Sequence, residues 1–423
     1  MKLLYYNINY KVNVVFLNIL FFALNILCLY NNETNSDFNS DIVKREGSNS
    51  FLLNQPSENL VRNKRFNIFG KRINTWNLPI YFSIDYGINT KVIVKALRLI
   101  ELETCIRFKL ENKNIVPKPA IYFKSTNYYK SDLGRQVNKN FQKIDVPLEG
   151  LNIGYVLREI FHTLGLEYED KRFDRNKYIY LIKKNLRLFN IKYFSINSKY
   201  AINGDFPPYD YGSIMHHDPY HSSKKMLKQL LMPINQLYAY TMGQTSQPSF
   251  LDYKKLNYLY CSNKCKQKKT NCFNGGYPDP NNCNKCKCIN GFAGSLCDHM
   301  APQDRLCGKT LIILDSYSRI LTLQGNMSCV IHLRVTLGYT IGIILEYVNI
   351  GKDGTRICQP YNSLEIKYYS DKSLTGPRFC HIVKPIIFYS KNNNVLIYYN
   401  NQYKYGGFRL KYKKIKNYYL LKN

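Results

Sequence analysis

Residues 158–169 read R-E-I-F-H-T-L-G-L-E-Y-E, and this stretch decides how the rest of the chain is interpreted. Apolar residues recur at helical spacing just before and within it, which predicts one amphipathic helix. Asn152 is a suitable N-cap for that helix, and Gly165 is a suitable residue to end it. Arg158 and His162 are four residues apart, so a helix would place both side chains on one face. The stretch therefore predicts a helix whose polar face gathers charged and imidazole side chains.

The same stretch follows the frame H-E-x-x-H-x-x-G-x-x-H, the zinc motif of the metzincin proteases. Gly165 tolerates the backbone reversal that would bring residue 168 back towards the helix. Glu159 matches the general-base position, and His162 matches the second histidine. Arg158 and Tyr168 stand where the first and third histidines would be. The resemblance implies a zinc protease site in which two of three metal ligands are substituted.

A second stretch, Tyr209 to His217, reads Y-D-Y-G-S-I-M-H-H and resembles the Met-turn of the astacin family, usually written S-x-M-H-Y. E-T-C-I-R-F around Cys105 and R-F-D-R-N-K-Y-I at 172–179 also fit this family, as does the stretch leading to Cys261. The resemblance covers residues 66–261. It implies an astacin-like metalloendopeptidase domain that uses zinc.

The segments around these motifs predict a mixed α+β domain. A helix is expected where apolar Val92, Ala96 and Ile100 recur, and strands are expected at 79–85 and 120–125. The family resemblance implies that these elements form a two-lobed domain with a cleft between the lobes.

Two positions near the expected metal look exchanged. The astacin Met-turn carries a tyrosine ligand where this chain has His217. Conversely, the motif has its third zinc histidine where this chain has Tyr168. His162 and His217, with Tyr168 and with His216 or His221 nearby, could form a rebuilt weak metal site. The alternative is that independent substitutions at these two positions produced the pairing by chance.

A catalytic zinc site needs three protein ligands and an open position for water. Glu159 is in place to shuttle protons, Met215 would lie in the core beneath the site, and Glu169 is expected to be a structural carboxylate near Arg172. Arg158 stays positively charged. At about 5 Å from Zn²⁺, that charge costs several kcal/mol even at an effective dielectric of about 20. We therefore expect zinc binding to be impaired and proteolysis to be lost or strongly reduced.

The first 65 residues predict targeting and processing segments. Residues 1–30 contain two lysines and then a mostly apolar run, which predicts a secretory signal peptide, with an uncleaved signal anchor as the alternative. Asparagines interrupt the run, so no stable membrane span is expected. Residues 31–65 are polar and end in R-N-K-R at 62–65, which predicts a propeptide with a basic processing site. An exposed basic loop is the alternative.

Within that propeptide, F-N-S-D at 38–41 resembles the astacin motif F-x-G-D, whose aspartate keeps the zymogen silent. Asp41 would have this role. We expect its carboxylate to pair directly with the Arg158 guanidinium, a contact that needs no metal.

The chain has thirteen cysteines, which favours an oxidising, extracellular compartment. Cys28 lies in the expected signal and leaves twelve, an even number. Six of these fall within 265–297, and their spacing resembles an EGF-like module over 262–298; zinc ligation by C-x-x-C-x-C is the alternative. The resemblances imply the pairs Cys105–Cys261, Cys265–Cys283, Cys272–Cys286 and Cys288–Cys297.

The family's second protease-domain disulfide has no counterpart. Tyr129 and Gly150 occupy the corresponding positions, so both halves are absent together and no stray thiol remains. We expect the fold to survive this loss with less rigidity near the cleft.

The C-terminal region predicts a β-sandwich. Residues 307–413 contain alternating apolar strands, for example at 310–314, 342–347 and 363–368, and resemble a CUB domain. A basic tail is expected at 414–423. The resemblance implies the disulfides Cys307–Cys329 and Cys358–Cys380.

The formal net charge of +31 invites nucleic acid, anionic glycan or membrane-surface partners. The basic residues are spread along the chain rather than concentrated in one tract, and the secretory features argue against nucleic acid. We therefore expect extracellular proteins or peptides as partners, with anionic glycans as a second class.

Three functions remain open at this point. The first is a secreted astacin-like pseudoprotease that binds extracellular proteins. The second is an active zinc metalloendopeptidase with a rearranged metal site. The third is a basic matrix- or glycan-binding protein. Whether the chain is an enzyme depends on the substituted zinc positions.

Overall fold

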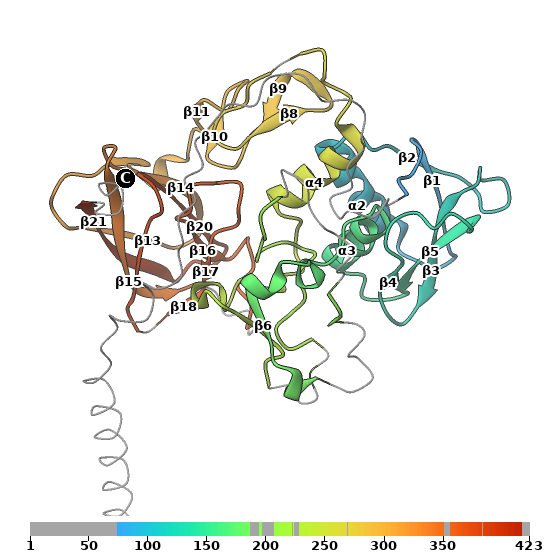
Figure 1. Ribbon diagram of the computed structural model, residues 1–423, viewed down its shortest axis with the longest axis horizontal. Helices are drawn as coiled ribbons and strands as arrows, with labels where there is room; N and C mark the ends of the chain where they lie inside the picture. The colour runs from blue at the N-terminus through green and yellow to red at the C-terminus, as the bar shows by residue number, and fades with distance from the viewer. Residues whose placement is uncertain are drawn as a thin grey trace, which may run out of the picture. The chain divides into compact units, whose positions relative to one another are not determined.

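The computed structural model describes residues 74–186, 194–196, 207–221, 223, 228–268, 270–350, 356–382 and 384–416 (Figure 1). The expected signal segment 1–30 and propeptide 31–65, with Asp41 and the basic site at 62–65, lie outside the described residues. Most of the tail expected at 414–423 also lies outside them.

A five-stranded sheet forms the first part of the described chain, in the order β2-β1-β3-β5-β4. Its strands pair in parallel except β4, which runs antiparallel to β5 and forms one edge. The strands predicted at 79–85 and 120–125 are confirmed as β1 and β3. The bounds are β1 Ile80–Ile84, β2 Phe108–Leu110, β3 Ala120–Thr126, β4 Lys130–Ser131 and β5 Phe141–Pro147.

Helices α2 (Thr90–Glu103) and α3 (Ile153–Thr163) bury their apolar faces in one core with this sheet. The predicted helix is confirmed as α2, although Val92 is only half-buried and its neighbour Ile93 is fully buried. The Asn152 side chain caps α3 by accepting hydrogen bonds from two backbone N–H groups of the first turn. The capping prediction is therefore confirmed.

Short elements connect α3 to α4 (Phe250–Cys261). This region has little regular structure because turns and single 3₁₀ turns replace continuous helices and strands. The elements are η1 Glu169–Lys171, η2 Arg175–Lys177, β6 Ile179–Leu181, η3 Lys183–Asn185, β7 Leu231–Pro233 and η5 Gln236–Tyr238.

A small disulfide-rich region follows α4. It contains two antiparallel pairs, β8 with β9 and β10 with β11. Three disulfides lie within this region, namely Cys265–Cys283, Cys272–Cys286 and Cys288–Cys297. A separate disulfide, Cys105–Cys261, joins the end of α4 to the segment after α2. These are the pairs that the resemblances implied. The strand bounds are β8 Tyr277–Asp279, β9 Asn282–Lys287, β10 Phe292–Ala293 and β11 His299–Met300.

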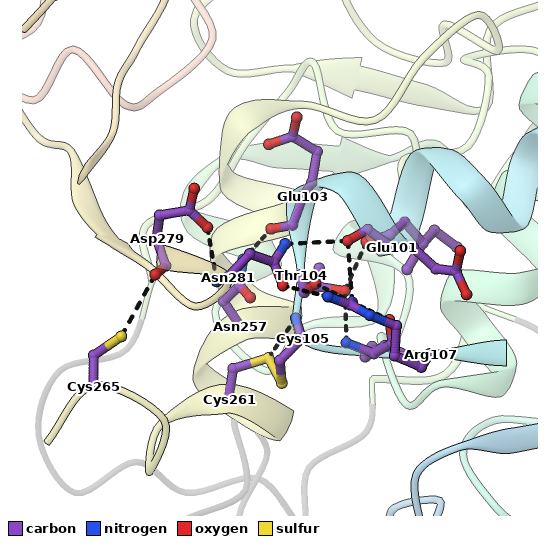
Figure 2. The surroundings of a disulfide bond; sticks show 12 residues. Glu101, Glu103, Thr104, Cys105, Arg107, Asn257, Cys261, Cys265, Asp279 and Asn281 are labelled. Atoms are coloured by element: carbon purple, nitrogen blue, oxygen red, sulfur yellow. Dashed lines mark hydrogen bonds between the residues drawn. A yellow bond between two sulfur atoms is a disulfide. The ribbon is translucent and has the colours of Figure 1, made fainter. Parts of the chain in front are cut away.

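This small region donates hydrogen bonds to the C-terminal end of α2, where the last carbonyl groups have no partner within the helix. Asn281 Nδ2 donates to the carbonyls of Glu101 and Leu102 at 3.2 and 3.3 Å, and Lys287 Nζ donates to Leu102 O at 2.9 Å. Figure 2 shows Asn281 beside the end of the helix and the Cys105–Cys261 disulfide. Side chains from the disulfide-rich region therefore contribute to the C-cap of α2, together with Arg107 and Asn257.

The C-terminal part consists of two five-stranded sheets whose apolar faces share one buried cluster. The orders are β12-β14-β20-β16-β17 and β13-β21-β15-β18, with β19 also paired to β15. This agrees with the expected all-β sandwich, and its disulfides are Cys307–Cys329 and Cys358–Cys380. The bounds are η6 Arg305–Cys307, β12 Leu311–Ile313, β13 Arg319–Gln324, β14 Met327–Arg334, β15 Tyr339–Asn349, β16 Ser363–Lys367, β17 Arg378–Phe379, β18 His381–Ile382, β19 Ile386–Tyr389, β20 Asn394–Asn401 and β21 Gly407–Lys416.

The disulfide-rich region contacts the sandwich through His332 on β14. His332 is 1% exposed, and its Nε2–H donates to Gly291 O at 3.0 Å. The ring of Phe292 meets the His332 imidazole edge-on, with 5.1 Å between the centroids. Tyr398 Oη adds a hydrogen bond to Asn290 O at 2.8 Å. This junction is therefore a small mixed core with one buried imidazole.

Residues 64–423 form one compact unit, and the sandwich core includes side chains from the segment before α4. Tyr238 Oη donates to Thr375 O at 3.3 Å, and the backbone N–H of Arg378 donates to Thr241 Oγ1 at 2.9 Å. Among the described residues, no helix is long and apolar enough to cross a membrane.

Candidate functional site

One cavity of about 1690 Å³ collects the side chains that the sequence motifs singled out. Arg158, Glu159 and His162 reach it from α3. Tyr168 reaches it from the turn after that helix, and His217 reaches it from the Met-turn. All five residues are less than 9% exposed. The chain therefore brings the substituted zinc motif and the Met-turn to one place.

Arg158 directs its guanidinium at backbone carbonyl groups. Its Nε donates to Ile214 O at 2.7 Å, and its Nη2 donates to His216 O at 3.1 Å and to Gln244 O at 3.3 Å. Hydrogen bonds from a cation are stronger than those between neutral groups. Arg158 therefore ties α3 to the Met-turn with a permanent positive charge, at a position where the motif would have a metal ligand.

A glycine in the first turn of α3 allows this contact. A Cβ atom at Gly154 would lie 1.6 Å from Thr245 O, far inside any van der Waals contact. Because residue 154 has no side chain, α3 can approach the backbone at 244–245, which carries one of the carbonyls that Arg158 binds.

Four rings contact one another in series along the cavity. The centroids of His162 and Tyr168 are 4.7 Å apart, those of Tyr168 and His217 are 4.2 Å apart, and those of His217 and His221 are 4.7 Å apart. Gly165 has a φ of +105°, which provides the reversal that brings Tyr168 onto His162. The Tyr168 ring therefore separates the two histidines that the sequence proposed as partners on one metal.

The two Met-turn histidines make different contacts. His217 Nδ1 is 2.8 Å from Oδ1 of the fully buried Asp170. Burial alone would raise the pKa of Asp170, but its interactions with His217 lower that pKa well below its usual range. His216 Nε2 is 2.7 Å from Tyr209 Oη, and burial lowers the pKa of His216. His216 does not line the cavity as His217 and His221 do.

Glu159 has an internal partner. Ser131 Oγ on β4 donates to Glu159 Oε2 at 2.6 Å and lies 3.1 Å from His162 Nδ1. On the other side of the imidazole, His162 Nε2 is 3.8 Å from Glu167 Oε1. Burial opposes ionisation of Glu167, yet contacts with His162 and Lys171 hold the pKa of this carboxyl below its ordinary value. His162 is thus held between a hydroxyl and a carboxylate.

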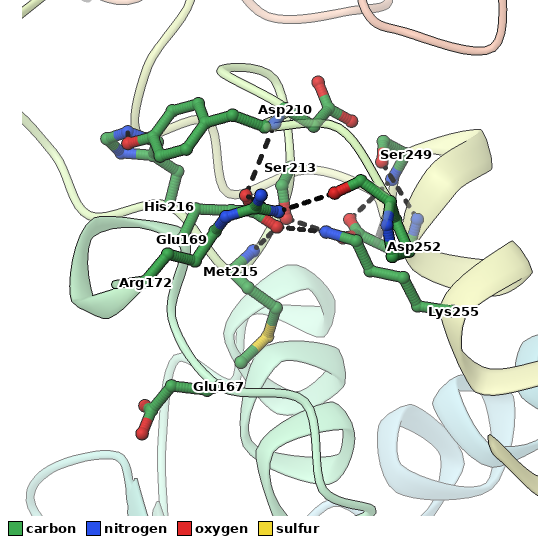
Figure 3. Close-up of polar contacts among 12 residues, drawn as sticks. Glu167, Glu169, Arg172, Asp210, Ser213, Met215, His216, Ser249, Asp252 and Lys255 are labelled. Atoms are coloured by element: carbon green, nitrogen blue, oxygen red, sulfur yellow. Dashed lines mark hydrogen bonds and ion pairs between the residues drawn. The ribbon is translucent and has the colours of Figure 1, made fainter. Parts of the chain in front are cut away.

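Beneath the cavity, Glu169 is the centre of a buried ion cluster (Figure 3). It is 2% exposed and accepts hydrogen bonds from Lys255 Nζ on α4 and from Arg172 Nη1 at 3.4 Å. The backbone N–H of Asp210 also donates to it, at 3.3 Å. Glu169 therefore joins the turn after α3 to α4 and to the start of the Met-turn.

The N-terminus of α4 anchors the Met-turn itself. Ser249 and Asp252 form a capping box, and Asp252 Oδ1 also accepts a hydrogen bond from Ser213 Oγ at 2.6 Å. The backbone N–H of Ile214 donates to Asp252 Oδ2 at 2.9 Å. Burial raises the pKa of Asp252. Met215 follows at 1% exposure and packs in the core, as the family resemblance implied.

Several residues of this site were not found from the sequence, among them Ser131, Asp170 and Lys255. Ser131 and Asp170 lie in segments without a motif. For Lys255 a signal was present, because Asp252 and Lys255 lie three residues apart between Leu251 and Leu256, in the stretch leading to Cys261 that forms α4. Charged residues on a buried face need partners, so this pair pointed to an internal ion cluster.

Tyr129, which replaces a cysteine of the family pattern, is linked to the segment that would have carried the other cysteine. Its Oη accepts a hydrogen bond from the backbone N–H of Asn152 at 2.9 Å, two residues after Gly150. Its ring stacks on Tyr155 with 5.0 Å between centroids. A hydrogen bond and a ring contact therefore connect Tyr129 to the segment just after Gly150.

These side chains do not fit a catalytic zinc ion, which needs three protein ligands. Within the described ranges, no group of three or more His, Cys, Asp or Glu side chains is placed to hold a metal. The positive charge of Arg158 lines the same cavity, and the Tyr168 ring lies between the imidazoles of His162 and His217.

Comparisons with known proteins agree with the motifs. The family model of the astacin peptidases matches residues 69–261. The chain is 31% identical over 328 residues to zinc metalloproteinase nas-34 of Caenorhabditis elegans, covering 77% of this chain and 53% of the relative. It is 29% identical over 375 residues to zinc metalloproteinase nas-26 of the same organism, covering 85% and 87%. The chain thus spans about half the length of nas-34.

Two solved structures are similar in part. High choriolytic enzyme 1, a hatching enzyme zinc-protease from Oryzias latipes, is 26% identical, with 43% of this chain and 89% of that chain covered and a TM-score of 0.39. The CUB1-EGF-CUB2 domain of human MASP-1/3 is 18% identical, with 36% and 57% covered and a TM-score of 0.21.

Proposed function

Residues 69–261 of this chain belong to the astacin family of zinc metalloendopeptidases, and from this premise we propose that the chain is a secreted pseudoprotease. Its protease domain keeps the scaffold of the family and has lost the catalytic metal. The cleft binds a segment of an extracellular polypeptide without cleaving it.

The observation that carries this proposal is the contact between Arg158 and the Met-turn. Three backbone carbonyls hold the guanidinium in the cleft, so the charge is part of the fold and is not free to swing away from an incoming dication. Coulomb repulsion of a buried guanidinium therefore acts against zinc at the same position. Removing that charge would also leave its carbonyl partners unsatisfied.

Binding of an extended polypeptide is supported by the sheet edge. Among the described strands, β4 pairs with β5 alone, through Lys130 with Asp145 and Ser131 with Ile144. An edge strand offers backbone donors and acceptors that a peptide in extended conformation can satisfy. Ser131 also lines the cavity, so a strand added at this edge would run along it.

We further propose the domain organisation that the sequence indicated. An astacin-like domain of two lobes covers 66–261, an EGF-like module covers 262–298 and a CUB-like sandwich covers 307–413. Three disulfides within 265–297 and two in the sandwich support the module assignments. Six disulfides in one chain also support secretion, because reducing compartments do not maintain them.

The test is a peptidase assay on the processed protein, with added zinc and with a chelator. We expect no zinc-dependent turnover by the unaltered chain and less than one equivalent of bound zinc. The double variant Arg158→His with Tyr168→His restores three imidazoles and should gain metal. Zinc-dependent cleavage by the unaltered chain, abolished in Glu159→Gln, would establish an active enzyme with a rearranged site and defeat the proposal.

A further inference from the structure

The cavity has an aromatic wall beside the sheet edge. Tyr129 and Tyr155 stack with 5.0 Å between their ring centroids and 22° between their planes. Both line the cavity, as does Tyr128. Tyr155 is 37% exposed and Tyr128 is 51% exposed, so ring surface is open to a ligand. We call the Tyr129–Tyr155 pair the aromatic shelf.

The aromatic shelf is fixed in place by the fold. Tyr129 Oη is bound by the backbone N–H of Asn152, the residue that caps α3, and Tyr155 belongs to the first turn of that helix. The Arg158 guanidinium carbon also lies 5.6 Å from the Tyr155 ring centroid. Because both rings are held before any ligand arrives, little conformational entropy is lost when a ligand contacts them.

The aromatic shelf adjoins the strand edge directly, because Tyr129 immediately precedes β4. A polypeptide added to the edge at Lys130 and Ser131 would present every second side chain to the same face. The shelf is therefore within reach of side chains carried by such a strand, whereas a small molecule would leave the edge unused.

The charges of the cavity favour an acidic ligand. Four carboxylates line it: Asp132 pairs with Lys139 at 2.7 Å, Glu159 accepts from Ser131, Glu167 lies against His162, and Asp218 accepts from the backbone N–H of Tyr220. By contrast, Lys130 and Lys228 line the cavity and have no anionic partner within the described ranges. With Arg158, Lys171 and Arg356, five basic side chains line the cavity against four carboxylates, so the lining has a formal excess of one positive charge.

We propose that the aromatic shelf is a subsite for an aromatic side chain of an extended, acidic polypeptide bound along β4. The proposal rests on the proposed function, in which the cleft holds a polypeptide. It adds that the cleft selects a polypeptide with an aromatic side chain at one position. An aromatic ring offset-stacked on a tyrosine gains more than its buried area alone provides. The selection depends on Tyr129, which stands where the family pattern has a disulfide cysteine.

The experiment uses the full secreted chain and immobilised octapeptides with an acidic background. One position at a time carries Phe, with Leu as the apolar control and Ala as the small control. We expect one register at which Phe binds about three- to ten-fold more tightly than Leu. In Tyr155→Leu this preference should vanish, whereas in Tyr129→Phe, which keeps the ring, it should persist.

Tyr180→Leu is the matched control, because Tyr180 is also an exposed tyrosine, at 54%, and lies on β6 outside the cavity. Equal binding of Phe and Leu peptides in every register would overturn the aromatic shelf and leave the proposed function intact. The shelf would also be overturned if Tyr155→Leu kept the Phe preference while its melting temperature matched that of the unaltered chain. Binding of no acidic peptide at all would overturn the proposed function and the shelf together.

Discussion

Arg158 shows how one substituted residue can hold α3 against the Met-turn at a position where the family motif has a zinc ligand. A histidine there would leave the Met-turn carbonyls to other donors, whereas the guanidinium satisfies three carbonyls at once. The protein can therefore hold α3 against the Met-turn without a metal between them. The same contact makes Arg158 costly to remove.

We predict that Arg158→Met lowers the free energy of unfolding by about 2–4 kcal/mol, because buried carbonyls lose charged donors. Urea denaturation measures the change. Arg98→Met is the matched control, since Arg98 is an exposed arginine on α2 and should shift stability by less than about 0.5 kcal/mol. A loss no larger than that of the control would show that the Arg158 contacts contribute little.

We predict strong coupling between Lys255 and Glu169 in a double-mutant cycle. Lys255→Met leaves a buried carboxylate with Arg172 as its remaining charged partner, so it should be costly alone. Adding Glu169→Gln should recover part of the loss, with a coupling energy of about 1–3 kcal/mol from thermal or urea unfolding. Additive effects of the two changes would contradict a direct ion pair.

Residue-level reasoning from the sequence found the substituted zinc positions because a motif fixes their spacing. It expected Glu169 to be a structural carboxylate near Arg172, which is confirmed at 3.4 Å. It could not find Ser131 or Asp170, whose partners lie 28 and 47 residues away in the chain. Contacts over such distances depend on how the elements pack, which no local pattern encodes.

At the scale of elements, α2 shows that a helix can depend on a neighbouring region for its cap. The last turn of α2 contains no basic residue, and Asn281 and Lys287 of the disulfide-rich region donate to two of its final carbonyls, beside Arg107 and Asn257 (Figure 2). The helix and the disulfide-rich region should therefore stabilise one another.

We predict that Asn281→Ala lowers stability by about 0.5–1 kcal/mol, because the carbonyls of Glu101 and Leu102 each lose one of two donors and keep only Arg107 and Lys287. Hydrogen exchange should show faster opening of the last turn of α2. Asn290→Ala, an exposed asparagine of the same region, provides the comparison and should leave that turn unchanged. Unaltered exchange at α2 in Asn281→Ala would refute the capping role.

Elements with strong periodicity were predictable, and short ones were not. The apolar spacing of α2 and the runs of β1 and β3 gave their positions within one or two residues. The segment between α3 and α4 consists of 3₁₀ turns and three-residue strands, which are too short to show a period. Its path is set by buried polar contacts such as those of Asp252, so propensity alone could not give it.

At the scale of the whole molecule, the regions share their cores. His332 is buried between the disulfide-rich region and the sandwich, and side chains of the segment before α4 join the sandwich cluster. The sequence resembled a string of modules, which favours independent units. Shared cores between modules could not be predicted, because each module's own pattern accounts for its strands and cysteines without them.

We predict that acid weakens this junction. Burial lowers the pKa of His332 to about 4, whereas an unfolded histidine titrates near 6.5. Between these values the unfolded chain binds the proton and the folded chain does not, so stability falls as the pH falls from about 6.5 to about 4. His332→Gln should remove about 2–3 kcal/mol of the stability difference between pH 7 and pH 4.5.

Urea unfolding at the two pH values measures that difference. His299→Gln is the control for replacing a histidine in the same part of the molecule, because the His299 side chain is 74% exposed. A pH dependence identical in His332→Gln and the unaltered chain would mean that the buried imidazole does not titrate as described.

The Cys105–Cys261 disulfide spans 156 residues and encloses the whole of the substituted site. If a peptidase nicks the chain once anywhere inside that loop, the two fragments stay covalently attached. The cut would leave the apparent mass on a non-reducing gel unchanged and appear as two bands only after a thiol is added. Intactness of this protein in an extracellular fluid therefore has to be judged on reduced samples.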